Sequence, residues 1–84
     1  MKYYVCYRKK NHLKETVYER NVLTLIRIKL DIENIYRWQD VGNLLNDVVE
    51  WRIYDENINL LEIGIVAENE VKIKDVIWYK KEEI

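Results

Sequence analysis

The side chains able to do nucleophilic chemistry are few. The chain has one cysteine, Cys6, one histidine, His12, and no serine, so a serine-based acyl-transfer triad is excluded. Cys6 and His12 lie six residues apart, with no second histidine and no glycine-rich oxyanion turn nearby. Because nothing in sequence reach activates either group, we predict no catalytic residue and no enzymatic activity.

Metal and cofactor sites lack the residues they need. One cysteine and one histidine are two ligands short of a tetrahedral zinc site. No D-x-D-x-D-G calcium loop is present. Gly42 and Gly64 are the only glycines, which rules out a glycine-rich phosphate loop. The sequence therefore predicts no metal and no cofactor.

A small ribonuclease-like toxin is the third hypothesis. Such a domain can work with cations that stabilise developing phosphate charge. The residues that would have to converge are Arg8, Lys10, His12 and Tyr18. The net charge of −1 disfavours this hypothesis, since RNA-cleaving domains are usually basic.

The charge is unevenly distributed along the chain. Residues 1–30 hold eight Lys/Arg and two Glu, whereas residues 31–84 hold six Lys/Arg and thirteen Asp/Glu. The basic third indicates an alternative function, a small nucleic-acid-binding regulator that uses its N-terminal hairpin. Its phosphate-binding patch would consist of Arg8, Lys9, Lys10 and Lys14.

The aromatic residues are the most informative set. The chain has seven Tyr, three Trp and no Phe, so every aromatic ring carries a polar group. We expect Trp38, Trp51 and Trp78 to be large core residues. Tyrosines beside arginines suit a protein interface or base stacking. The candidate protein-binding residues are Tyr4, Tyr36, Arg52, Tyr54 and Tyr79.

The N-terminal half predicts a hairpin and a helix. Residues 2–9 alternate as a strand, a polar turn follows at 9–12, and residues 13–20 form a weaker returning strand. Residues 21–32 are ambiguous. The alternation of Ile26, Ile28, Leu30 and Ile32 favours a strand, whereas Leu23, Ile26 and Leu30 also suit a helix. Helical spacing follows over 35–49, with Asn34 or Asp40 as its N-cap.

The C-terminal third predicts a three-strand meander. Its strands are expected around Trp51, around Ile63 with Leu61, Ile63 and Ile65 on the inner face, and from Val71 onward, with a turn at 55–57. The last strand changes phase, which predicts a bulge near 74–75, and residues 80–84 are expected to fray. The fold class is therefore α+β: one antiparallel sheet of about five or six strands, with a helix on one face.

Length and composition limit the remaining possibilities. We expect residues 1–84 to form a single domain. No segment approaches the apolar length that spans a bilayer or serves as a signal peptide, so the chain is expected to be cytoplasmic. The abundance of Ile, Lys, Asn and Tyr reflects AT-rich coding, as in certain bacteria and their phages or plasmids.

The leading hypothesis is a non-catalytic protein-binding protein. It would be a phage- or mobile-element-encoded inhibitor or modulator of a host defence or replication factor. The acidic C-terminal two-thirds favours a basic or nucleic-acid-binding host protein as the target. The small size and open sheet edges also predict a homodimer.

Overall fold

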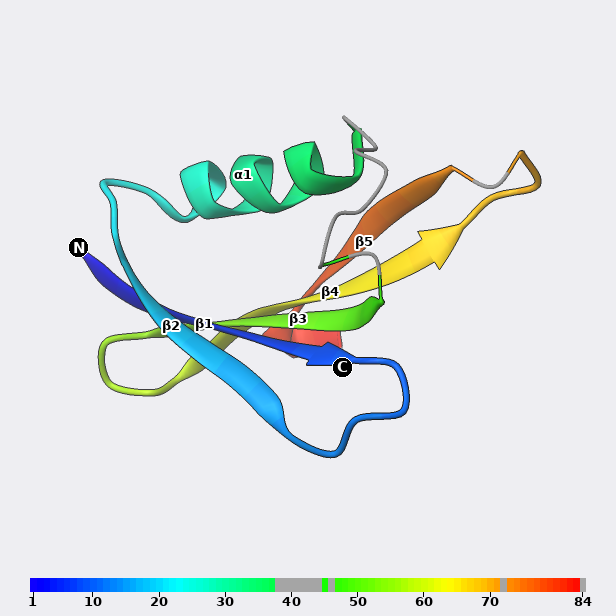
Figure 1. Ribbon diagram of the computed structural model, residues 1–84. Coiled ribbons are helices and arrows are strands. Elements are labelled where there is room, and N and C mark those ends of the chain that lie inside the picture. Colours follow the sequence, from blue (N-terminus) through cyan, green and yellow to red (C-terminus); the bar gives the residue numbers. More distant parts are fainter. Residues whose placement is uncertain (38–44, 46, 72, 84) are drawn as a thin grey trace.

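The computed structural model shows an antiparallel sheet with a helix on one face (Figure 1). It describes residues 1–37, 45, 47–71 and 73–83. The strands are β1 (Lys2–Lys9), β2 (Glu15–Asn21), β3 (Val48–Asp55), β4 (Leu60–Glu68) and β5 (Lys74–Lys80). The helix α1 spans Leu25–Arg37, and a 3-10 turn, η1, spans Lys81–Glu83. The α+β fold class, with its N-terminal hairpin, helix and C-terminal meander, is confirmed.

The strand order, β2-β1-β3-β4-β5, explains why a helix follows β2. β2 and β3 both pair with β1 in the antiparallel sense, so they run parallel to each other on either side of it. Two parallel strands cannot be joined by a tight turn and need a crossover of a dozen or more residues. Helix α1 lies within that crossover and covers one face of the sheet (Figure 1).

The interpretation of residues 21–32 as a strand is wrong. Only Asn21 belongs to a strand, and from Leu25 onward the segment is helical. The alternating residues form two pairs at i, i+4 spacing, which lie on different sides of a helix. Ile28 and Ile32 are buried against the sheet, whereas Ile26 and Leu30 are exposed. A helix can therefore use half of a period-2 pattern as its core face.

The helix predicted over 35–49 is displaced in the structure. Residues 35–37 form the last turn of α1, and residues 48 and 49 already belong to β3. Residues 38–44 lie outside the described part of the chain, and so do the expected cap at Asp40 and the expected core residue Trp38.

The last strand begins later than predicted, and the bulge at 74–75 is absent. β5 starts at Lys74 and pairs with β4 in one continuous register. Val71 and Ile73 instead lie in the preceding turn, where their backbone N–H groups donate to Asn69 Oδ1. The change of phase in the sequence therefore marks the end of the turn that holds Val71 and Ile73 and the start of β5. Residues 81–83 form η1 rather than a frayed tail.

The core lies between α1 and the sheet. Trp51, Ile53 and Val5 from the strands and Ile28 and Ile32 from the helix are its most deeply buried side chains. Trp51 is thus a core residue as predicted, and Trp78 is half-buried against this core.

Polar contacts attach α1 to both halves of the sheet. Lys29 Nζ lies 2.8 Å from Glu62 Oε1, and Trp78 Nε1 donates to Glu33 Oε1 at 2.8 Å. On the other side, Arg20 pairs with Asp31 at 2.8 Å. Within the described residues, no helix combines the length and the apolar character that crossing a membrane requires.

Candidate interaction surface

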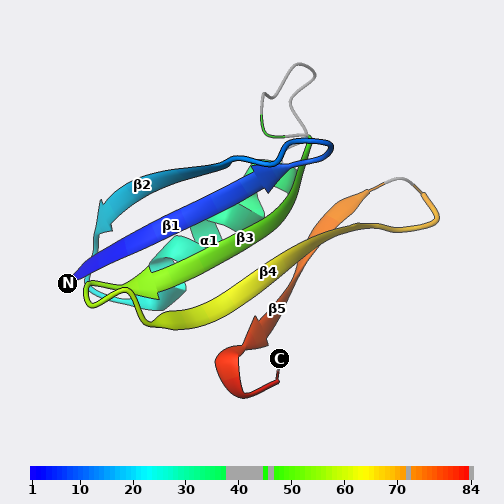
Figure 2. The same cartoon turned by 90° about the horizontal axis from the view of Figure 1, so that it is seen from below.

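The face of the sheet opposite α1 is the candidate interaction surface. Figure 2 shows the sheet from this side, and no other described element lies in front of β1, β3 and β4. Side chains alternate between the two faces of a strand. Because Tyr3, Val5, Trp51 and Ile53 point into the core, the residues between them point outward. We call this side the uncovered face.

The strand register arranges the uncovered face into rows that cross the sheet. One row crosses all five strands and consists of Val17, Cys6, Arg52, Ile63 and Tyr79. The next row consists of Glu15, Arg8, Glu50, Ile65 and Ile77. Beside the first row, Tyr4 and Tyr54 lie directly opposite each other on β1 and β3. We refer to the first two as the Arg52 row and the Glu50 row.

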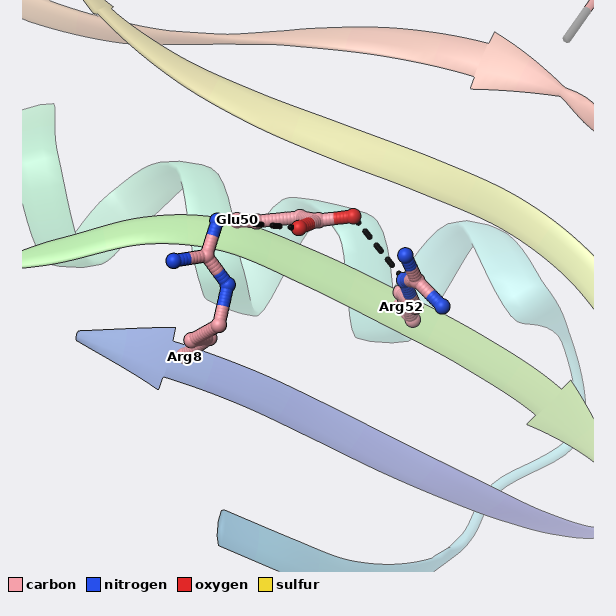
Figure 3. A network of polar contacts seen from close by, with 3 residues as sticks. All are labelled: Arg8, Glu50 and Arg52. Atoms are coloured by element: carbon pink, nitrogen blue, oxygen red, sulfur yellow. Dashed lines mark hydrogen bonds and ion pairs between the residues drawn. The ribbon is translucent and has the colours of Figure 1, made fainter. Parts of the chain in front are cut away.

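An ion-pair network occupies the middle of this face (Figure 3). Arg52 Nε donates to Glu50 Oε1 at 2.9 Å, and Arg8 Nη2 lies 3.4 Å from Glu50 Oε2. Hydrogen bonding to Glu50 raises the pKa of Arg52 above its already high ordinary value. Two guanidinium groups share one carboxylate, so the centre of the face carries a surplus positive charge.

Apolar side chains dominate the β4–β5 side of this face. Ile65, Ile77 and Tyr79 have relative exposures of 38%, 46% and 39%. Beside them, Ile63 is buried although it lies outside the core cluster. Because Arg52 lies between Ile63 and Cys6 in the register, its aliphatic stem covers apolar surface while its charged end stays accessible.

The structure brings together four of the five candidate protein-binding residues. Tyr4, Arg52, Tyr54 and Tyr79 all lie on the uncovered face. Sequence reasoning missed Glu50 and Ile77, and it placed Ile63 and Ile65 on the inner face of their strand, whereas both lie on the uncovered face. Their alternation with core residues along β3, β4 and β5 was the available signal, but the strand pairing needed to group them was not visible.

The prediction that Tyr36 is a surface residue is wrong. Its relative exposure is 2%, in the core beneath α1. Trp51 Nε1 donates to the Tyr36 hydroxyl at 2.9 Å, and that hydroxyl donates to the Leu45 carbonyl at 3.3 Å. The polar group of the ring is thus satisfied inside the protein, which removes any need for a surface position.

The buried Tyr36 predicts a loss of stability at alkaline pH. Burial raises the pKa of Tyr36 to about 12 from its ordinary value near 10. The folded state then keeps a proton that the unfolded chain has lost. The free energy of unfolding should therefore fall between about pH 10 and pH 12, by on the order of 2 kcal/mol.

The matched variant Tyr36→Phe has no phenol to titrate at this position. Its free energy of unfolding should therefore fall less between about pH 10 and pH 12 than that of the wild type. At neutral pH it should be about 1–2 kcal/mol less stable, because the Trp51 N–H loses its acceptor. Urea titrations of both proteins at neutral and alkaline pH measure the difference. Equal alkaline losses in the two proteins would contradict this role for Tyr36.

Arg8, Lys10 and Lys14, three of the four basic residues of the nucleic-acid hypothesis, do not share one face, and the fourth, Lys9, is the last residue of β1, after a register shift in the pairing with β3. Arg8 lies on the uncovered face beside Glu50, and Lys14 is exposed after the β1–β2 turn. Lys10 lines a cleft of about 260 Å³ with Asp47, Glu68 and Lys74, where β3 and β4 are no longer paired. The carboxylates in these surroundings reduce the attraction for phosphate.

The residues considered for catalysis do not converge either. Cys6 is buried on the uncovered face, and burial raises the pKa of its thiol, which disfavours the reactive thiolate. Tyr18 packs against Tyr7 on the helix side, with ring centroids 6.4 Å apart, whereas Arg8 lies on the opposite face. His12 is exposed beyond the end of β1. Within residues 1–37, 45, 47–71 and 73–83, no cluster of three metal-ligating side chains occurs.

No protein-family description matches this chain, and no curated protein or solved structure is detectably similar to it.

Proposed function

We propose that this protein is a non-catalytic protein-binding protein and that the uncovered face is its binding surface. The observation that carries the proposal is the joint presence of exposed apolar and tyrosine side chains with two arginines on one helix-free face. Tyrosine and arginine are enriched where protein interfaces concentrate their binding energy. A face of this kind offers an apolar contact area with charged groups that orient the partner.

The distribution of charge favours protein over nucleic acid on this face. Glu15, Glu19 and Glu50 all lie on it, and a polyanion would approach them unfavourably. Arg8 and Arg52 are already paired with Glu50. A partner that brings apolar side chains to Ile65 and Ile77 and hydrogen-bond acceptors to the guanidinium groups fits better.

The class of target is part of this proposal. The abundance of residues with AT-rich codons favours an AT-rich bacterium or its phage as the source. There the chain would inhibit or modulate a defence or replication protein. A basic or nucleic-acid-binding target remains a prediction that depends on the acidic balance of residues 31–84.

A matched pair of variants tests the proposal. Ile77→Lys places a charge on the uncovered face, and Ile26→Lys places the same charge on the outer side of α1, where Ile26 is 64% exposed. Tagged wild-type and variant proteins are used as baits in lysates of AT-rich hosts, infected and uninfected. We expect a protein captured by the wild type to be captured by Ile26→Lys and lost with Ile77→Lys.

Two results would contradict the proposal. One is capture that Ile77→Lys leaves unchanged, and the other is no enrichment above an unrelated acidic control in any lysate. Nuclease treatment and a salt series distinguish the nucleic-acid alternative, whose binding should weaken steeply with salt. In that case Lys9→Glu combined with Lys10→Glu should abolish binding.

A further inference from the structure

We propose that the uncovered face packs against the same face of a second copy of this chain, giving a two-fold dimer with both helices on the outside. This inference concerns the face of the proposed function but does not require its target. A target that binds there would displace the second copy. The inference depends on the geometry of the Arg52 and Glu50 rows.

On β3, β4 and β5 the two rows are complementary under one particular two-fold axis, whereas on β1 and β2 the same axis places Arg8 over Cys6 and Glu15 over Val17. Along each strand the rows are two residues apart, or about 7 Å. This axis lies in the plane of the interface, perpendicular to the strands and midway between the two rows. It brings the Arg52 row of one copy over the Glu50 row of the other. Arg52 then faces Glu50 of the second copy, and Glu50 faces its Arg52, so both charge contacts are attractive.

The same operation brings apolar groups together on the β4–β5 side. Ile63 comes over Ile65 of the second copy, and Tyr79 comes over Ile77. These contacts lie next to the ion-pair network and would remove Ile65, Ile77 and Tyr79 from water. Sheets that pack face to face keep their strand directions within about 30° of each other, which this antiparallel arrangement allows.

The alternative axis, parallel to the strands, is less favourable. When this axis passes over the central strand β3, it brings Arg52 over Arg52 and Glu50 over Glu50, so like charges meet at the centre of the contact. The size of the face is also adequate for a weak dimer. Five strands about 4.8 Å apart, each presenting a few outward residues, give a footprint on the order of 20 Å by 20 Å. About 800 Å² would then be buried over both copies, which is below the roughly 1,200 Å² of stable specific interfaces and corresponds to a weak association.

Mixing two charge variants tests this geometry. Arg52→Glu leaves only carboxylates at positions 50 and 52, and Glu50→Lys leaves only cations there. Each variant alone should associate at least about tenfold more weakly than the wild type. An equimolar mixture should recover dimers, because each introduced charge then faces its opposite on the second copy. Sedimentation equilibrium distinguishes the 10.4 kDa monomer from the dimer, and circular dichroism shows that each variant is folded.

A second pair of variants keeps the test independent of the ion-pair network. Ile77→Lys should weaken the dimer at least about tenfold, and Ile26→Lys should not change it. The proposal is overturned if the wild type is monomeric up to about 500 µM, if folded charge variants fail to associate when mixed, or if Ile26→Lys disrupts the dimer as much as Ile77→Lys. A monomeric wild type whose captured target is still lost with Ile77→Lys would leave the proposed function standing.

Discussion

Replacing Lys29 by methionine is expected to lower the free energy of unfolding by about 2–4 kcal/mol. Lys29 Nζ lies 2.8 Å from Glu62 Oε1 and 5.3 Å from the centre of the Trp78 ring. Glu62 is 5% exposed, on the side of β4 that faces the helix. Methionine keeps the length of the stem but leaves this carboxylate buried without its cation, and an unpaired buried charge is costly.

Two further variants identify the cause of this loss. Lys29→Met combined with Glu62→Leu removes both charges and should recover most of the lost stability. Arg27→Met removes another ion pair of α1, the one with Asp31, but the Arg27 side chain is 68% exposed. Its cost should stay below about 0.5 kcal/mol. Urea denaturation measures all four proteins, and equal costs for Lys29→Met and Arg27→Met would show that the burial of Glu62 does not matter.

Replacing Gly64 by valine is expected to cost about 2–3 kcal/mol. A Cβ atom at position 64 would lie 2.7 Å from Trp78 Cζ3 and 2.8 Å from Val76 Cγ1. The Trp78 ring cannot move aside freely, because its Nε1 donates to Glu33 on α1. Gly64 thus permits a close approach of Trp78 and Val76 to the backbone of β4.

The contact with Trp78 makes the cost of this substitution depend on a second residue. In a background with Trp78→Leu, Gly64→Val should cost at least about 1 kcal/mol less than in the wild type. Ala67→Val is the control, since Ala67 lies on the same strand with its side chain on the uncovered face. It should change stability by less than about 0.5 kcal/mol. Strict additivity of the Gly64 and Trp78 substitutions would contradict steric crowding as the cause.

Local periodicity in the sequence was sufficient to predict most of the sheet. Residues 2–9, 49–54 and 61–65 alternate strictly enough to predict the strands and the residues that share a face, and Trp51 was correctly placed in the core. The expectation that Ile63 and Ile65 face inward was wrong, because both lie on the side of the sheet opposite α1. Periodicity was not sufficient for residues 21–32. There Ile26, Ile28, Leu30 and Ile32 satisfy both a period of two and an i, i+4 spacing. The choice between them was made by the topology, because the crossover from β2 to β3 requires a long connection over one face of the sheet.

Residue type alone was a weaker guide to the surface. The same reasoning placed Tyr4, Tyr54, Tyr79 and Tyr36 outside, but Tyr36 is in the core. Nothing in the sequence indicates that Trp51 and Leu45 would satisfy its hydroxyl, since those partners come from separate segments of the chain. A tyrosine is buried or exposed according to whether its hydroxyl finds a partner, and only the tertiary structure supplies that information.

The candidate surface depends both on the local sequence pattern and on the pairing of the strands. Alternation along each strand is a local property, so the sequence by itself determined which residues of β1, β3 and β4 share a face. The strand order and register are not local, because they depend on which strands pair to bury the common core. They bring Arg8 beside Glu50, 42 residues later in the chain, and align Arg52 with Ile63 and Tyr79. The composition of the uncovered face was therefore decided by the pairing of the strands and by the helix that covers only the other side.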